Sequence, residues 1–211
     1  MMATPAKGYC GLTLILGLFL AGCSSNSTLP PATVQNSLTT SVDNYQYLSG
    51  PNDTVGIFVW RYPELSGTFI VRPDGKITTS LVEDVVVSGK TPTQVARDME
   101  AILSKYIRDP VVTVSVSGFI GPYSEQVRVI GAATNPKSIN YNQYMTLLDL
   151  MIEVGGLTEF ADGNAAKLVR VKDGRQLTYN LRLDDLIREG EIAANVDILP
   201  GDVVIIPEAW F

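Results

Sequence analysis

The sequence predicts an α+β protein built from two small mixed domains. Three observations support this class: hydrophobic residues at every second position over 55–59, a helical apolar stripe that begins at Thr91-Pro92, and a second stripe that begins at Thr146 and ends at Gly155-Gly156. Alternation with period two is typical of half-buried strands, and spacing of three and four residues is typical of amphipathic helices. Strand-like runs precede and follow each helix, so each domain is predicted to pair a sheet with a helix.

The first domain is predicted over residues 45–118 as a β-β-α-β unit. A turn at 73–76 joins two strands, because Pro73 fixes φ, Asp74 bonds the local backbone and Gly75 accepts positive φ. Thr91 is the predicted N-cap of the helix, which Asp109-Pro110 ends. The expected strands are 55–59, 68–72, 77–82, 85–87 and 111–117. The expected buried helix face is Val95, Met99, Ile102, Leu103 and Tyr106.

The second domain is predicted over residues 126–208 with a β-grasp-like arrangement. Thr146 caps a helix that Gly155-Gly156 ends in a left-handed cap, and a short helix covers 183–188. Pro200-Gly201-Asp202 turns the chain into the last strand. The expected strands are 126–131, 138–141, 168–171, 178–181 and 203–206. Residues 118–125, which contain Gly, Pro and Ser, mark the boundary between the domains.

Residues 1–22 are predicted to be a signal peptide. Lys7 is the only charge in this stretch, and the apolar run that follows is too short to span a bilayer. The run ends in Leu20-Ala21-Gly22-Cys23, which resembles the lipobox of bacterial lipoproteins. That resemblance implies cleavage between Gly22 and Cys23, a lipid on Cys23 and sorting to the outer membrane. The alternative is an ordinary secretory signal with an incidental cysteine. Residues 23–44 are rich in Ser, Thr, Asn and Pro and are predicted to be a flexible tether.

The composition excludes several classes of site. The chain has no histidine and two cysteines, of which Cys10 would leave with the signal peptide. A mature chain would therefore have no thiol nucleophile, no disulfide and no histidine base or metal ligand. It would carry 15 basic and 22 acidic residues, which argues against nucleic acid as a partner. Apart from the lipid, we expect no cofactor and no metal.

Both halves of the sequence resemble known domains. The first half is similar to the polysaccharide export domain in YLSGPND (47–53), YPELSG (62–67), VRPDGKI (71–77), GKTP (89–92) and YIRDPVV (106–112). The second half is similar to the SLBB domain, a soluble-ligand-binding β-grasp, in VIG (129–131), NP (135–136), LLDL (147–150), GGLTEFA (155–161) and LPGDV (199–203). Each fragment alone is weak, but their order along the chain is specific.

The resemblance implies an outer-membrane polysaccharide export lipoprotein of the Wza type. Such proteins form homo-oligomeric rings on the periplasmic face of the outer membrane and pass a capsular polysaccharide or exopolysaccharide chain. They work with an inner-membrane polysaccharide co-polymerase and perform no covalent chemistry. The single SLBB domain is most similar to the exopolysaccharide export proteins of exosortase-associated (PEP-CTERM) clusters.

The chain departs from the longest family members at its end. These carry further SLBB repeats and a C-terminal amphipathic helix that forms the pore, whereas this sequence ends directly after the last predicted strand. We therefore expect a separate outer-membrane β-barrel as a partner. Trp210-Phe211 is either a docking tip for a membrane or partner, or a segment that folds back on the domain.

The residues that attract attention also have structural explanations. Asp53, Asp74 and Asp202 each lie within two residues of a glycine or proline, so turn formation accounts for them. The acidic residues of 184–191 are either a cation site or a solvated face, with the second reading favoured. Four tyrosines serve either sugar stacking, or core packing or subunit contact: Tyr62, Tyr123, Tyr141 and Tyr144. The complete set of motif turn residues is Gly50, Pro51, Asp53, Pro73, Asp74, Gly75, Gly155, Gly156, Pro200, Gly201 and Asp202.

Two functions of different classes remain open from the sequence. One is a ring component for polysaccharide export. The other is a monomeric glycan-binding lipoprotein that acts as a sensor or adaptor. A glycan hydrolase that uses only carboxylates is a distant third, because no pair of acidic residues is singled out by the sequence.

Overall fold

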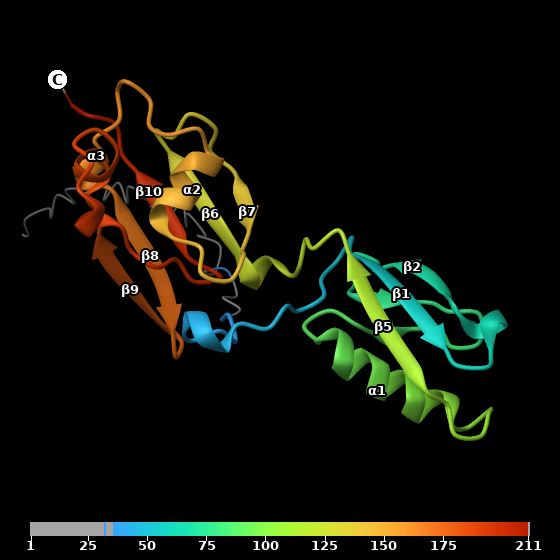
Figure 1. Cartoon of the computed structure of the whole chain (residues 1–211). Helices are drawn as coiled ribbons and strands as arrows, with labels where there is room; N and C mark the ends of the chain where they lie inside the picture. Colours follow the sequence, from blue (N-terminus) through green and yellow to red (C-terminus); the bar gives the residue numbers. More distant parts are fainter. Residues whose placement is uncertain (1–31, 33–35, 211) are drawn as a thin grey trace, which may run out of the picture. The chain divides into compact units, whose positions relative to one another are not determined.

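The computed structural model describes residue 32 and residues 36–210. The predicted signal peptide, Gly22, Cys23 and Phe211 lie outside the described residues. The described chain contains three α-helices and sheets of three, five and two strands, so the predicted α+β class is confirmed (Figure 1). Its buried hydrophobic residues form two clusters, one within 55–112 and the other within 127–206.

The first domain packs one helix against one face of a three-stranded sheet. Strands β1 (Thr54–Val59), β2 (Gly67–Ile70) and β5 (Val112–Ser117) are antiparallel in the order β2-β1-β5, and α1 (Pro92–Leu103) packs along β5 (Figure 1). A short 3-10 helix, η2 (Pro63–Leu65), connects β1 to β2. The alternation read from the sequence holds, because Val55, Ile57 and Val59 are buried on the side of the core.

Helix α1 begins as predicted but ends earlier. Thr91 forms a capping box with Gln94, in which each side chain bonds the backbone of the other residue. Buried Val95, Met99 and Leu103 give the expected face. The helix ends at Leu103 rather than at 109, and Tyr106 lies in the turn that follows, with 60% of its surface exposed. Its assignment to the buried face was therefore wrong.

The predicted strand over 77–82 is shorter than expected. Strand β3 covers Lys76–Ile77 and pairs with β4 (Val85–Val86) in a small hairpin of its own. The segment between them is a turn because the backbone N–H of Thr79 donates to the Val82 carbonyl at 2.8 Å, and the Thr79 hydroxyl donates to the same carbonyl at 3.0 Å. A local side-chain bond of this kind competes with sheet pairing.

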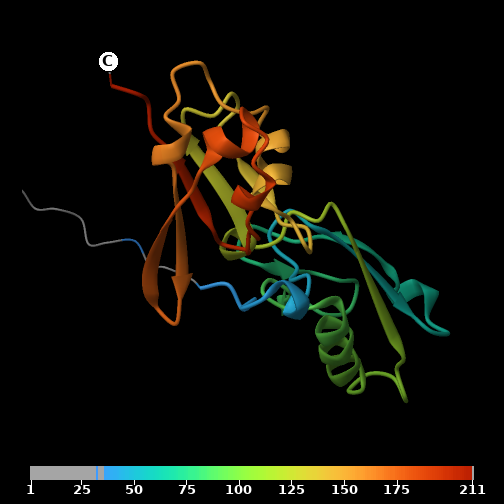
Figure 2. The ribbon, with the colours of Figure 1, turned by 60° about the vertical axis from the view of Figure 1, so that its left-hand side comes forward.

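The second domain is a five-stranded mixed sheet with helices packed on it. The order is β7 (Ser138–Asn140), β6 (Gln126–Gly131), β10 (Val203–Ile206), β8 (Lys167–Lys172) and β9 (Arg175–Asn180). Strands β6 and β10 run parallel in the centre, and the other neighbours are antiparallel. Strands β8 and β9 form a hairpin at the edge, which stands clear in both ribbon views (Figure 1, Figure 2).

The main helix of the second domain, α2 (Leu147–Glu153), has both predicted ends. Thr146 and Asp149 form the N-terminal capping box. At the other end the backbone N–H of Gly155 bonds the carbonyl of Ile152, and that of Gly156 bonds the carbonyl of Met151. Both glycines have positive φ, so this end is a Schellman motif. Helix α3 (Leu183–Ile187) and the 3-10 helices η3 (Tyr123–Glu125), η4 (Gly163–Ala165) and η5 (Ile192–Ala194) complete the domain.

Residues 36–45 run along the second domain, although the sequence had placed 36–44 in the flexible tether. The Ser37 hydroxyl donates to Glu125 at 2.8 Å, and the ring of Tyr45 packs edge-on against Tyr141 at 4.9 Å between centroids. The short 3-10 helix η1 (Val42–Asn44) accepts a hydrogen bond from Gln143. The sequence pattern did not predict these contacts, because their partners lie far away along the chain, 88 residues for Ser37 and 101 residues for Val42.

Candidate functional site

The Gly50–Asp53 turn is built around a fully buried carboxylate. One oxygen of Asp53 accepts from the backbone N–H of Gly50 at 2.8 Å and from the Tyr47 hydroxyl. The other oxygen accepts from the backbone N–H of Ile120 at 2.7 Å. The turn contains Pro51, and β1 begins at the residue that follows the turn. A buried carboxylate whose oxygens are bonded in this way joins the two chain segments that enter and leave the first domain.

The surroundings of Asp53 leave no room for larger groups. A Cβ atom on Gly50 would lie 2.0 Å from the carbonyl carbon of Gly121, so only glycine fits there. Burial, and then the hydrogen bond to Asp53, raise the pKa of Tyr47 well above its ordinary value. The phenol therefore stays protonated and remains a donor at physiological pH. The hydrogen bonds of Asp53 and Tyr47 thus connect segments of the fold with one another.

The Leu199–Asp202 turn repeats this design in the second domain. Asp202 is fully buried, and one of its oxygens accepts from the backbone N–H of Leu199 at 2.8 Å. Arg170 on β8 donates to both carboxylate oxygens at 2.7 and 2.8 Å. Gly201 has a φ of +84°, which the turn requires. The backbone N–H of each aspartate also bonds the first carbonyl of its own turn at 3.2 Å, and a strand follows both turns.

The third predicted turn, at 73–76, lies at the surface. Gly75 has a φ of +79°, and its N–H donates to the carbonyl of Arg72 at 2.8 Å. Arg72 pairs with Asp74 and, at 2.7 Å, with Asp84. The hydrogen bond from Arg72 lowers the pKa of Asp74 below its ordinary value. Arg72 therefore contacts the exposed carboxylates of both Asp74 and Asp84.

Within the described part of the chain, one face of the first domain's sheet is not covered by another element. We call it the open sheet face, and it consists of the outward positions of three strands: Thr54, Gly56 and Phe58 on β1, Thr68 and Ile70 on β2, and Thr113, Ser115 and Ser117 on β5. The opposite face packs on the core with α1. The open sheet face thus carries hydroxyl and small side chains, with no charged residue among its eight positions.

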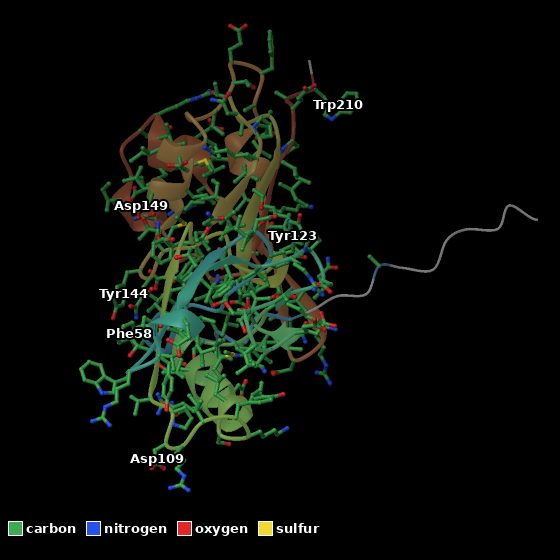
Figure 3. All side chains as sticks on the ribbon, turned by 90° about the vertical axis from the view of Figure 1, so that its right-hand side faces the viewer. Phe58, Asp109, Tyr123, Tyr144, Asp149 and Trp210 are labelled. Carbon is green, nitrogen blue, oxygen red and sulfur yellow. The ribbon has the colours of Figure 1, made fainter. Side chains whose placement is uncertain are left out.

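An aromatic pair stands at one end of this face. Phe58 and Trp60 are 50% and 58% exposed, and their rings meet edge to face with 6.3 Å between centroids. Figure 3 shows Phe58 at the surface of the domain. The backbone N–H of Trp60 donates to the Val111 carbonyl at 2.9 Å, which extends the pairing of β1 with β5. The sequence reading missed both aromatics, although the alternation that buries Val55, Ile57 and Val59 also predicts that residues 58 and 60 face outward.

Family models match both domains in order. Residues 41–117 match the polysaccharide biosynthesis/export protein family, and residues 126–180 match the SLBB domain. The chain therefore carries one region similar to each of these two families, in this order. The first domain is its export domain and the second its single SLBB domain, as the sequence motifs had indicated.

Two curated relatives extend this result. The chain is 27% identical over 184 residues to the EPS I polysaccharide export outer membrane protein EpsA of Ralstonia nicotianae, covering 75% of this chain and 46% of the relative. It is 24% identical over 182 residues to the protein of the same name in Ralstonia solanacearum, covering 75% and 47%. The chain thus spans about half the length of the curated relatives it matches. Among the described residues, no helix is both long and apolar enough to cross a membrane.

Two acidic residues of the SLBB domain, Asp184 and Asp185, are engaged locally. Asp184 accepts from the backbone N–H of Asn164 at 3.1 Å and pairs with Arg188. Asp185 accepts from the Asn164 side chain at 2.6 Å and pairs with Arg182. These bonds fasten η4 to α3. No group of three or more metal-ligating residues gathers anywhere in the described part of the chain.

The predicted aromatic candidates divide into two kinds. Tyr141 is buried and Tyr62 packs against the export domain's core, so both contribute to packing. Tyr123 and Tyr144 are exposed, and the Trp210 side chain is entirely exposed beyond the last strand (Figure 3). Burial, mainly, raises the pKa of Tyr45 to about 12 where it packs on Tyr141.

Proposed function

We propose that this chain is a non-enzymatic, lipid-anchored component of an apparatus that exports a capsular polysaccharide or exopolysaccharide across the outer membrane. One observation carries the proposal: an export domain and an SLBB domain follow each other in one chain, and the relatives that match three quarters of it are named as polysaccharide export outer membrane proteins. The cargo is a polysaccharide chain.

The chemistry of the described residues supports a non-enzymatic role. Glycoside hydrolysis by carboxylates needs one acid that donates a proton and one carboxylate that is free to act as nucleophile or base. Asp53 and Asp202 are fully buried, and their oxygens are bonded to donors of the fold. Asp184 and Asp185 are held by arginines and Asn164. These carboxylates therefore serve the structure.

The sheet edges support assembly into a ring. Strands β2 and β5 are the edges of the export-domain sheet, and β7 and β9 are those of the SLBB sheet. All six residues of β9 are exposed. An unpaired edge can add a strand from a neighbouring subunit, and repetition of one such contact around an axis closes a ring. We infer a cyclic homo-oligomer on the periplasmic face of the outer membrane.

The anchor and the partners complete the proposal. Lipid on Cys23 would hold the ring at the membrane, and two or more acyl chains hold a protein there firmly. The partners that the sequence resemblance implied are an inner-membrane polysaccharide co-polymerase and a separate outer-membrane barrel. Crosslinking in cells, followed by identification of the captured membrane proteins, tests both.

The mass of the purified protein in detergent tests the assembly. We expect a single discrete oligomer that persists on dilution. The control is the same measurement at several ratios of detergent to protein, because chance sharing of micelles by lipidated chains decreases as detergent is added, whereas a specific oligomer persists. A monomer at every concentration and every detergent ratio would refute the ring and favour the monomeric glycan sensor.

A further inference from the structure

We propose that the open sheet face of the export domain is a binding surface for an uncharged stretch of glycan, with Phe58 and Trp60 as its stacking platform. The inference rests on the proposed function and adds to it the surface that contacts the cargo and the chemical class recognised. It is carried by the juxtaposition of two exposed aromatic rings with a sheet face of hydroxyl groups and no charge.

The cross-strand register places the hydroxyl groups in rows. Thr68 and Ser115 lie opposite Gly56 on its two sides, and Ser117 lies opposite Thr54 in the next row. Gly56 has no side chain, and the Ser115 hydroxyl lies close to it on this face. A Cβ atom on Gly56 would lie 2.7 Å from the Ser115 hydroxyl oxygen, so a larger residue there would displace that hydroxyl.

The aromatic pair closes one end of the rows. Thr113 lies opposite Phe58, and Trp60 continues the same face of β1. Aromatic rings carry negative charge on their faces, and the C–H groups of a sugar ring, which carry slight positive charge, pack against them. Hydroxyl side chains both donate and accept hydrogen bonds, as sugar hydroxyls do. The face thus offers both contacts that a neutral sugar chain needs, side by side.

The composition of the face favours glycan over other occupants. A protein face that binds an anionic membrane surface typically carries lysine and arginine, and the eight positions carry neither. The core of a subunit interface is enriched in apolar and aromatic groups and buries about 800 Å² on each partner. Five of the eight positions here are threonine or serine and one is glycine. Large exposed apolar residues are confined to Phe58 and Ile70 among the eight, with Trp60 next to them.

Tryptophan fluorescence provides a direct test. The chain has two tryptophans, so in the Trp210→Phe background Trp60 is the single reporter. We would titrate the full-length protein in detergent with a neutral oligosaccharide, maltoheptaose or cellohexaose, and in parallel with oligogalacturonate, which is acidic. The expected result is a saturable change in Trp60 fluorescence with a neutral oligosaccharide and a weaker response to the acidic one. No saturable change with any of the three would overturn the proposal.

Variants separate this surface from the rest of the domain. Phe58→Ala and Gly56→Thr should each weaken oligosaccharide binding about tenfold, the first by loss of a stacking ring and the second by displacing the Ser115 hydroxyl from the face. Gly56→Thr suits a strand, so the fold should persist. Tyr106→Ala, at an equally exposed aromatic in the turn after α1, is the matched control and should bind normally. Equal affinity of all variants would contradict the site.

Two further readouts distinguish the inference from the proposed function. If Phe58→Ala reduces the oligomer mass and leaves oligosaccharide affinity unchanged, the face is a subunit interface and the glycan site is refuted. If Phe58→Ala and Gly56→Thr lose binding while cells secrete less polysaccharide, the site and the function are both supported. Deletion of the whole chain without loss of secretion would refute the function, whatever the binding result.

Discussion

Asp53 and Asp202 are buried carboxylates, and each is stable there because donors of the fold surround it. Asp53 is held by backbone N–H groups and one phenol, whereas Asp202 is held by a guanidinium and one backbone N–H. The sequence predicted both turns from their proline and glycine chemistry. It could not predict the burial or the partners Ile120 and Arg170, which lie 67 and 32 residues away.

The Asp202→Asn variant tests how much the buried ion pair of Asp202 and Arg170 stabilises the SLBB domain. We expect it to lower the free energy of unfolding of the SLBB domain by about 3 kcal/mol, because it leaves Arg170 without its counter-charge. Hydrogen exchange of the β8 and β10 amides measures the loss in that domain. Asp74→Asn, in an exposed pair, is the control and should leave exchange unchanged. Equal protection in the two variants would show that the Arg170 pair is not stabilising.

Lipidation of Cys23 is the second prediction at this scale. If the lipobox reading holds, wild-type protein incorporates labelled palmitate, whereas Cys23→Ser does not and stays as an uncut or mislocalised precursor. Cells grown with the label and analysed by gel give the answer. Normal labelling of Cys23→Ser would leave the predicted anchor without support.

At the scale of elements, the capping signals correctly predicted where two helices begin. The apolar patterns, in contrast, overestimated the lengths of α1 and of the strand predicted at 77–82. Thr91 and Thr146 form the capping boxes, and Gly155-Gly156 forms the Schellman end. The predicted strand at 77–82 was too long because Thr79 bonds the Val82 carbonyl and turns the chain. Tyr106 fits the spacing of α1, but the helix ends before it.

The two capping boxes should respond differently to pH. Thr91→Ala and Thr146→Ala should each cost about 1 kcal/mol near neutral pH. The hydrogen bonds from Thr146 lower the pKa of its partner Asp149 in the folded protein. The stabilisation from these bonds is therefore fully present above the unfolded pKa of about 3.9, and it is lost as pH falls through the lower folded pKa. Gln94, the partner of Thr91, does not titrate.

Denaturant unfolding of both variants between about pH 3 and 6 tests this difference. The cost of Thr146→Ala should shrink toward the acidic end, and the cost of Thr91→Ala should stay constant. A cost of Thr146→Ala that is independent of pH would contradict the role of the Asp149 carboxylate.

At the scale of the whole molecule, the described residues form two separate hydrophobic cores, and the edges of their two main sheets are the features on which we base the proposed homo-oligomer. The sequence predicted the export domain and the SLBB domain because their turn motifs are local and ordered along the chain. It did not predict that residues 36–45 bind the SLBB domain, since Ser37, Val42 and Tyr45 carry no periodic pattern. The open sheet face was implicit in the alternation of β1, yet the exposed aromatics Phe58 and Trp60 were recognised only in the structure.

If this chain takes part in polysaccharide export, as we propose, its loss should reduce the amount of polysaccharide outside the cell. The chain would be deleted in the bacterium that makes it, and extracellular and cell-retained polysaccharide would be quantified with and without a plasmid that restores it. Loss of secreted polysaccharide, recovered by the plasmid, is the predicted result. Unchanged secretion in the deletion strain would contradict the proposed role of this chain in polysaccharide export.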